Sequence, residues 1–215
     1  PVFGVSYIGG FVGFCGGDYT GGSSSDSYAL GDVQATGDNV GGFVGYFTSK
    51  CSISRAYAKG QVSGRNYIGG FLGNGSPCGS WWCGISIYES YSTGSAIGSS
   101  NVGGFCGINS GCTISNCFWD KDTSLLTTSA GGTGKTTVQM TDIDTYVDAG
   151  WRISADVLWY YWYMPVNDYP RLSWEMNGQK IPNVVGLMQP EAMTAITDAN
   201  FTIGRILYQY NNQLP

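Results

Sequence analysis

The chain has 215 residues but no histidine, and only 12% of its residues are charged. Without histidine it lacks the commonest general base and the commonest metal ligand, so we expect no metal or other cofactor. Its ten Lys and Arg residues are scattered. No basic patch is present to hold a phosphate backbone, so we expect no nucleic-acid partner.

A long hydrophobic run is also missing. The longest strongly apolar stretch, around residues 157–166, is too short to cross a bilayer, so the sequence predicts no membrane span in this chain. No signal peptide is visible, and the sequence starts at Pro1 without a Met. That start is typical of a processed chain or of a piece of a longer one.

The seven cysteines contain no CxxC pattern, which disfavours a zinc ribbon or a thioredoxin-like site. Disulfides in an oxidising compartment, or buried small apolar side chains, are the remaining interpretations. We expect at least one disulfide, with Cys78–Cys83 as the best local pair. Cys112 and Cys117 lie in an expected strand, where straight geometry would hold them too far apart to bond. An odd count leaves one thiol buried or paired between molecules.

Glycine and aromatic residues are abundant, with 34 glycines and 14% aromatic residues. Because 42% of the residues are hydrophobic, the chain can bury a core. Many glycines, Ser/Thr-rich turns and regularly spaced aromatic residues favour β-structure with tight bends.

One hexad occurs four times, at residues 8–13, 40–45, 68–73 and 102–107, in forms such as Val-Gly-Gly-Phe-Val-Gly. A second segment of the type Ser/Ala-Tyr-Ala/Ser-Xaa-Gly follows the first three hexads, at residues 27–31, 56–60 and 90–94. The fourth copy degenerates to Cys-Phe-Trp-Asp at residues 117–120. Each repeat is therefore expected to form a short strand, a turn, a second short strand and a return.

Stacking of these repeats explains the glycines inside the expected strands, because glycine suits places where another backbone approaches closely. In a stack, neighbouring strands lie about 4.8 Å apart. The four hexad phenylalanines would then form a ladder: Phe11, Phe43, Phe71 and Phe105. A single repeat cannot bury its apolar face, whereas stacked repeats can.

The hexad followed by Ile-Ser-Xaa-Xaa-Tyr-Ala-Xaa-Gly resembles the GLUG motif repeat of large bacterial and archaeal surface proteins, adhesins and some secreted peptidases. This resemblance covers about residues 6–120, within a repeat array assigned to residues 1–120, and implies an extracellular scaffold without catalytic residues. The predicted fold is mainly β: a short right-handed β-solenoid or β-helix-like array, followed by an aromatic-rich cap and a small α+β piece.

Residues 121–178 are interpreted as the cap that covers the open end of the array. The run Gly134-Lys135-Thr136 within this segment is similar to a nucleotide-binding phosphate loop. However, Ser129 stands where the first glycine of such a loop belongs, and the preceding residues make a poor buried strand. We therefore expect no nucleotide, and instead a glycine turn that leads into a short amphipathic helix.

Several aromatic residues are candidates for contact with glycans or partner proteins. In an insertion of the third repeat, the alternatives are a turn pinned by the local disulfide and a binding loop. In the aromatic-rich segment, the alternatives are a core or subunit interface and a glycan site. The candidate contact residues are Trp81, Trp82, Trp159, Tyr161 and Trp162.

Residues 179–215 resemble the first half of a PASTA domain, with an Ile-Pro-Asn-Val-Val-Gly-Leu opening. A helix is predicted over residues 189–200, with Pro190 in its first turn, and a strand over residues 202–210. PASTA domains occur outside the membrane in bacterial cell-wall kinases and penicillin-binding proteins. The resemblance supports an extracellular location and a modular design.

The leading functional hypothesis is a secreted or cell-surface structural or adhesive protein, with filament formation as one form of it, whose partners are copies of itself or other surface proteins. The alternative is a module that binds cell-wall or extracellular glycans. An enzyme is not expected, because acidic residues such as Asp120 and Asp122 are equally explained by turns and helix starts. Asn74 and Asn200 fit the N-glycosylation pattern.

Overall fold

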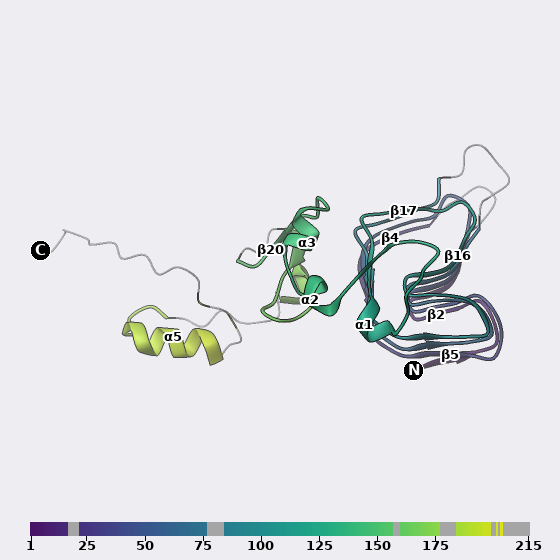
Figure 1. The fold of residues 1–215 in the computed structure, drawn as a ribbon. Coiled ribbons are helices and arrows are strands. Elements are labelled where there is room, and N and C mark those ends of the chain that lie inside the picture. Colours follow the sequence, from purple (N-terminus) through teal and green to yellow (C-terminus); the bar gives the residue numbers. More distant parts are fainter. Residues whose placement is uncertain are drawn as a thin grey trace, which may run out of the picture.

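The computed structural model describes residues 1–16, 22–76, 84–156, 160–176, 184–198, 201 and 203. The protein is mainly β, with parallel sheets, as the sequence predicts (Figure 1). Repeat 1 contains β1 (Val2–Gly4), β2 (Ile8–Gly9), β3 (Val12–Cys15) and β4 (Ser23–Ala29). Repeat 2 contains β5 (Val33–Ala35), β6 (Val40–Gly41), β7 (Val44–Phe47) and β8 (Ser52–Ala58).

The later repeats have one strand more. Repeat 3 contains β9 (Val62–Ser63), β10 (Asn66–Gly69), β11 (Leu72–Gly75), β12 (Ser86–Tyr88) and β13 (Tyr91–Ser92). Repeat 4 contains β14 (Ala96–Ile97), β15 (Ser100–Gly103), β16 (Cys106–Asn109), β17 (Thr113–Ser115) and β18 (Phe118–Asp120).

Equivalent strands of successive repeats pair in parallel and in register. The first sheet has the order β1-β5-β9-β14, and the hexad strands form two further four-stranded sheets in the same repeat order. In Figure 1 the repeats overlie one another, so the same path is traced again and again. Each of these three sheets therefore runs along the stack and takes one strand from each repeat. A seven-stranded sheet contains the remaining repeat strands, with β4 and β8 from repeats 1 and 2, two strands each from repeats 3 and 4, and β19 (Thr133–Lys135).

The hexad is not the single strand that the alternation predicts. In repeat 2 it contributes β6 and the start of β7, with a bend at Gly42 and Phe43 between them. Each repeat consequently has four or five short strands instead of two. The bend turns both Phe43 and Val44 into the largest core cluster, while Val40 enters a smaller one.

Close backbone contact explains the two central glycines of the hexad. A Cβ on Gly42 would overlap the carbonyl oxygen of Gly70 in the next repeat, and one on Gly70 would overlap that of Gly104. A Cβ on Gly41 would collide with the carbonyl of Val44 and lie 2.7 Å from that of Phe71. Since the obstacle is backbone and not a movable side chain, no other residue type fits at these positions.

Two further corners recur in every repeat and adopt left-handed backbone conformations in non-glycine residues. The first corner precedes the hexad, at Tyr7, Asn39, Tyr67 and Asn101, with φ between 51° and 62°. The second lies at Asp26, Arg55, Glu89 and Asn116, with φ between 46° and 53°. The second corner interrupts the alternation expected for β8, so that Ala56 joins the core while Tyr57 packs on the opposite side.

The predicted phenylalanine ladder is confirmed. Neighbouring rings from Phe11 to Phe105 lie 4.7, 4.8 and 4.7 Å apart between centroids and are nearly parallel. Phe43, Phe71 and Phe105 are fully buried. The ladder forms the centre of the main core cluster, which also contains Ile53 and Ile87.

Backbone hydrogen bonds at the hexad have one direction along the stack. The amides of Phe11 and Val12 donate to the carbonyl of Phe43, and those of Phe43 and Val44 donate to the carbonyl of Phe71. In repeat 4 the Oγ of Ser129 replaces that carbonyl and accepts from the amides of Phe105 (3.1 Å) and Cys106 (2.9 Å). Ser129 thus satisfies two amides that would otherwise lack a partner.

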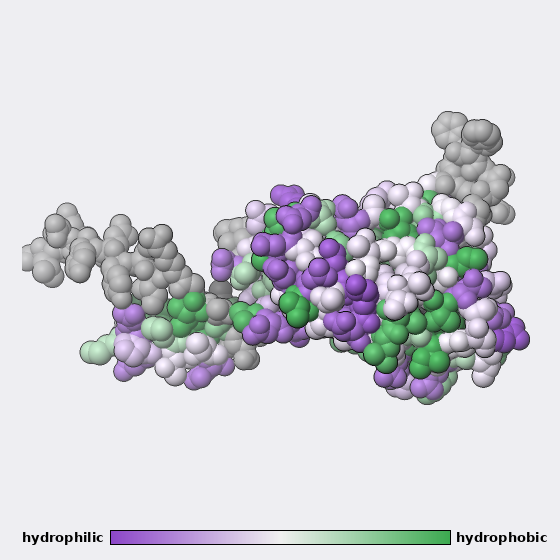
Figure 2. Space-filling model, in the orientation of Figure 1, coloured by the Kyte–Doolittle hydropathy of each residue, from purple (hydrophilic) through white to green (hydrophobic). Residues whose placement is uncertain are grey.

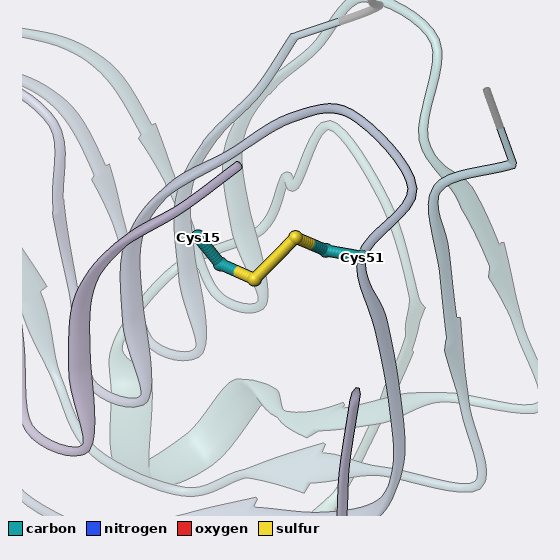
Figure 3. The surroundings of a disulfide bond; sticks show 2 residues. All are labelled: Cys15 and Cys51. Atoms are coloured by element: carbon teal, nitrogen blue, oxygen red, sulfur yellow. A yellow bond between two sulfur atoms is a disulfide. The ribbon is translucent and has the colours of Figure 1, made fainter. Parts of the chain in front are cut away.

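A disulfide joins Cys15, at the end of β3, to Cys51, directly before β8 (Figure 3). It confirms the expectation of at least one disulfide, although in a pair that the sequence did not single out. Its sequence separation is 36 residues. Closing a loop of this length stabilises a fold by about 4 kcal/mol in the chain-entropy description.

The segment after the repeats lies beside the stack in Figure 1 and carries most of the short helices. We call residues 121–176 the aromatic segment. Its elements are α1 (Lys121–Ser124), β19 (Thr133–Lys135), α2 (Thr137–Met140), α3 (Asp144–Val147), β20 (Ile153–Ser154), β21 (Trp162–Tyr163), β22 (Arg171–Leu172) and α4 (Ser173–Met176). β19 pairs with β18 and so extends the sheet of the repeats that contains β18. A small separate sheet contains β20, β21 and β22.

The predicted C-terminal helix is confirmed as α5 (Gln189–Asp198), which has no buried residue. Nearly all of the strand predicted over residues 202–210 lies outside the described residues. None of the described helices has the length and apolar character needed to cross a membrane.

We predict that Gly70→Ala destabilises the protein by about 3 kcal/mol, because the added methyl must displace the backbone of the neighbouring repeat. Gly84→Ala is the matched control, since nothing lies within 4 Å of a Cβ at that position. Chemical denaturation of both variants measures the difference. Equal stability of the two would show that the close backbone approach at the hexad does not constrain the fold.

Candidate interaction surface

The aromatic segment contacts all four repeats. Three tyrosines of the repeats, Tyr28, Tyr57 and Tyr91, form a second ladder with centroid separations of 5.2 and 5.1 Å. Tyr57, Tyr91 and Phe118 pack into one core with Trp151, Trp162 and other residues of the aromatic segment. This core runs along the side of the stack, whereas the sequence led us to expect the whole segment over its end; only residues 128–133 of the segment lie over the edge of repeat 4.

Side-chain hydrogen bonds fix the aromatic segment to each repeat in turn. Trp174 Nε1 donates to the carbonyl of Asp26 in repeat 1 (3.1 Å), and Tyr57 of repeat 2 donates to Glu175 (2.8 Å). Two more bonds continue the series in repeats 3 and 4: Tyr91 OH to the carbonyl of Pro170 (2.6 Å) and Trp151 Nε1 to the carbonyl of Asn116 (2.9 Å). The segment is therefore a lateral clamp on the stack.

Asp120 is the buried carboxylate that holds the start of this clamp. Its Oδ1 accepts from the amides of Asp122 and Thr123 and so caps α1, as expected for an acidic residue at a helix start. Its Oδ2 accepts from Thr137 Oγ1 (2.7 Å) and from the hydroxyl of Tyr169 (2.6 Å). A fully buried charge with four donors is a structural anchor.

A line of charged side chains follows the second left-handed corner at the edge of the clamp. Arg55 forms two hydrogen bonds with Asp26, at 2.6 and 2.7 Å, which hold the pKa of Asp26 below its usual value. The guanidinium also lies 4.1 Å from the ring centroid of Tyr161. Glu89, the next residue in the line, has its pKa raised by burial. These residues and the tyrosine at position 160 form what we call the corner surface.

The corner surface was not identified from the sequence. A signal was present, since the residue two positions before each repeat tyrosine is Asp26, Arg55 and Glu89 in turn. When the repeats stack, these equivalent positions come together, and the side chains along the row are then negative, positive and negative. Figure 2 shows that polar side chains gather on the aromatic segment, while a hydrophobic group lies over the repeats near α1.

The predicted glycan-contact residues have different fates. Trp162 is fully buried in the clamp core and has no ring face open to a ligand. Tyr161 is 43% exposed, with Arg55 over its ring. Trp81, Trp82 and Trp159 lie outside the described residues. The structure thus does not bring the five candidates together into one described site.

The other predicted site residues are also only partly described. Asn74 lies in β11, and its Nδ2, the atom that would carry a glycan, donates to Asn39 Oδ1 (2.8 Å). Asn200 and the predicted disulfide pair, Cys78 and Cys83, lie outside the described residues.

Repeat 4 contains three free thiols that are buried in the core: Cys106, Cys112 and Cys117. Burial raises the pKa of Cys112 to about 12 and raises that of Cys106 further above its usual value. A thiol that stays protonated at neutral pH is a poor nucleophile, so these side chains act as small apolar core residues. In the described part of the chain, no group of three His, Cys, Asp or Glu residues is placed to hold a metal ion.

The loop-like run Gly134-Lys135-Thr136 is accounted for by packing. Gly134 and Lys135 lie in β19, paired with Trp119 and Asp120 of β18, and not in a phosphate-type loop. A Cβ on Gly134 would come within 2.8 Å of the Trp119 ring. Thr136 caps α2, which has only four residues, in agreement with the predicted short helix.

Comparisons with known proteins give limited information. No family model and no solved structure matches the chain. A stretch of 152 residues, 69% of this chain, is 30% identical to a protein of Evansella cellulosilytica with the provisional description Gly-rich membrane protein. The matched stretch covers 13% of that protein, so most of the relative has no counterpart in this stretch.

We predict that Tyr169→Phe lowers the stability by about 1 kcal/mol near neutral pH, because it removes a half-exposed hydrogen bond to a charged acceptor. Burial and the bond to Asp120 raise the pKa of Tyr169 from 10.0 to about 12. A raised pKa means that this stabilisation is complete below pH 10 and is lost as the pH rises to about 12.

Denaturation of both proteins between pH 7 and pH 12 tests this prediction. The difference between wild type and Tyr169→Phe should shrink across the upper end of that range. Tyr160→Phe, at an exposed ring, is the control and should change the stability little at any pH. A difference that does not vary with pH would contradict a role for the ionisable hydroxyl.

Proposed function

We propose that the chain is a non-catalytic extracellular structural protein, a β-solenoid-like scaffold of a secreted or cell-surface assembly. The observation that carries the proposal is the parallel, in-register stack of four repeats, held by backbone contacts, a disulfide and a lateral clamp. Most buried polar groups described above serve this stack. The resemblance to GLUG repeats points to the same class of scaffold.

Location outside the cytoplasm has three supports. The Cys15–Cys51 disulfide suits an oxidising compartment, because cytosolic reductants keep most thiols reduced. The relative from Evansella cellulosilytica is described as a membrane protein, which fits a protein that belongs to a cell surface. The partial PASTA resemblance of residues 179–215 adds a cell-wall association to the proposal.

The location is tested by labelling intact cells of the producing organism with an antibody against the repeat stack. We expect labelling without permeabilisation, and a Cys15–Cys51 disulfide in protein alkylated before lysis and analysed by mass spectrometry. A cytosolic protein probed in parallel controls for leakage. Signal only after permeabilisation, together with alkylated Cys15 and Cys51, would refute the extracellular assignment.

Glycan binding is the second candidate, and the exposed pair Tyr160 and Tyr161 favours it. Arg55 and Arg152 lie near these rings. An aromatic ring can pack on the apolar face of a sugar, while a charged group beside it can bind the sugar's hydroxyls. Retention on insoluble peptidoglycan or cellulose tests this function. We expect Tyr161→Ala to lower retention several-fold, whereas Tyr88→Ala, an exposed tyrosine on β12, leaves it unchanged. Equal retention of both variants and wild type would exclude this surface.

A further inference from the structure

The two edges of the stack differ in how they are covered. At repeat 4, residues 128–133 lie on the edge and make backbone contacts, such as the bond from Gly104 N to the carbonyl of Thr128 (3.1 Å). At repeat 1, Phe11 is 49% exposed, while its three ladder partners are fully buried. The exposed apolar residues of this edge are Val2, Phe3, Val5, Tyr7, Phe11 and Phe14.

The edge of repeat 1 has an unused hydrogen-bond acceptor. In repeats 2, 3 and 4 the carbonyl of the hexad phenylalanine accepts two amides of the preceding repeat. Among the described residues, no donor reaches the carbonyl of Phe11. A partner that continues this pattern must bring two backbone amides and a ring that stacks on Phe11.

A cavity of about 260 Å³ marks where an apolar side chain is missing on the same edge. Ser24 lies on its wall, in register with Ile53, Ile87 and Ile114 of the later repeats. Phe11, Val12, Cys15 and Phe43 provide apolar lining. Because repeat 1 has serine where the other repeats have isoleucine, the space can accept an isoleucine from a neighbour.

A second copy of this chain does not fit the edge. The amides that would have to pair with the Phe11 carbonyl are those of Phe105 and Cys106 in the second copy, and both already donate to Ser129. Two copies facing each other through repeat 1 would bring the Phe11 carbonyls together, acceptor against acceptor. The tyrosine ladder is also closed, since Trp174 stacks on Tyr28 at 5.7 Å.

We propose that the edge of repeat 1 is a docking surface for a further hexad repeat with a free amide edge, joined through Pro1 to Val2 in the same polypeptide. The new repeat stacks its phenylalanine on Phe11, donates two amides to the Phe11 carbonyl and fills the cavity above Ser24. Continuity with the three existing repeat interfaces supports this occupant, as does the much longer glycine-rich relative. The proposal rests on the stack alone and not on the extracellular location.

The test adds a copy of residues 33–61 between Pro1 and Val2, in phase with the pairing of Val2 with Val33. Within the copy, Tyr57→Ser keeps the place of Trp174 free, and Tyr46→Phe, the residue found in repeat 1, gives its peptides a distinct mass. We expect the thermal midpoint to rise by about 5 °C. Hydrogen exchange should show protected amides at the Phe43 and Val44 positions of the copy.

Two matched controls carry a further change in the added copy. Phe43→Asp removes the ring that stacks on Phe11 and should abolish both the rise and the protection. Ile53→Ser leaves the cavity empty and should give about half the rise. An unchanged midpoint with unprotected amides in the parent extension, or an equal rise in all three proteins, would overturn the proposal.

Sedimentation of the unextended chain completes the test. We expect a monomer at all concentrations, with no dependence on Phe11. A concentration-dependent dimer that Phe11→Asp abolishes would show that a second copy occupies the edge and would overturn the proposal. None of these outcomes depends on where the protein is located in the cell, so failure here leaves the extracellular assignment to its own experiment.

Discussion

The structure depends on direct contact between the backbones of successive repeats at the hexad glycines. At Gly42 and Gly70 the carbonyl of the next repeat occupies the space where a side chain would begin. This contact sets the distance between repeats, and the phenylalanine rings then stack at 4.7–4.8 Å. Ring stacking, burial of the ladder and the register of every sheet all follow from that spacing.

At the hexad the backbone hydrogen bonds run in one direction along the stack, so the hexads at its two edges need different partners. At one edge an amide row must find acceptors, and Ser129 supplies a hydroxyl in place of a carbonyl. At the other edge the carbonyl of Phe11 has no donor among the described residues. The segment that leads into the run similar to a phosphate loop therefore terminates the stack, because Ser129 and Gly132 fit against repeat 4, and Gly134 fits against Trp119.

The sequence was sufficient to predict the repeats, the parallel β character and the phenylalanine ladder, because these depend on spacing that recurs four times. It was not sufficient to predict the bend at Gly42 and Phe43, since alternation within a hexad looks the same for one strand as for two. It also did not predict the Cys15–Cys51 disulfide, because the two residues approach only after repeats 1 and 2 are stacked. For Trp162 the sequence left a core position and a glycan site as alternatives, because aromatic character alone cannot distinguish a ring that binds a ligand from one that fills a core; the structure places it in the core.

The lateral clamp has a consequence for how the protein bears force. An array of repeats in which each unit contacts only its neighbours can peel apart from one end, one unit at a time. Here a single segment is bonded to Asp26, Tyr57, Tyr91 and Asn116 in turn, and a covalent link ties the first repeat to the second. A pull between the two ends is therefore shared among all repeats, and the array yields as one unit instead of unzipping.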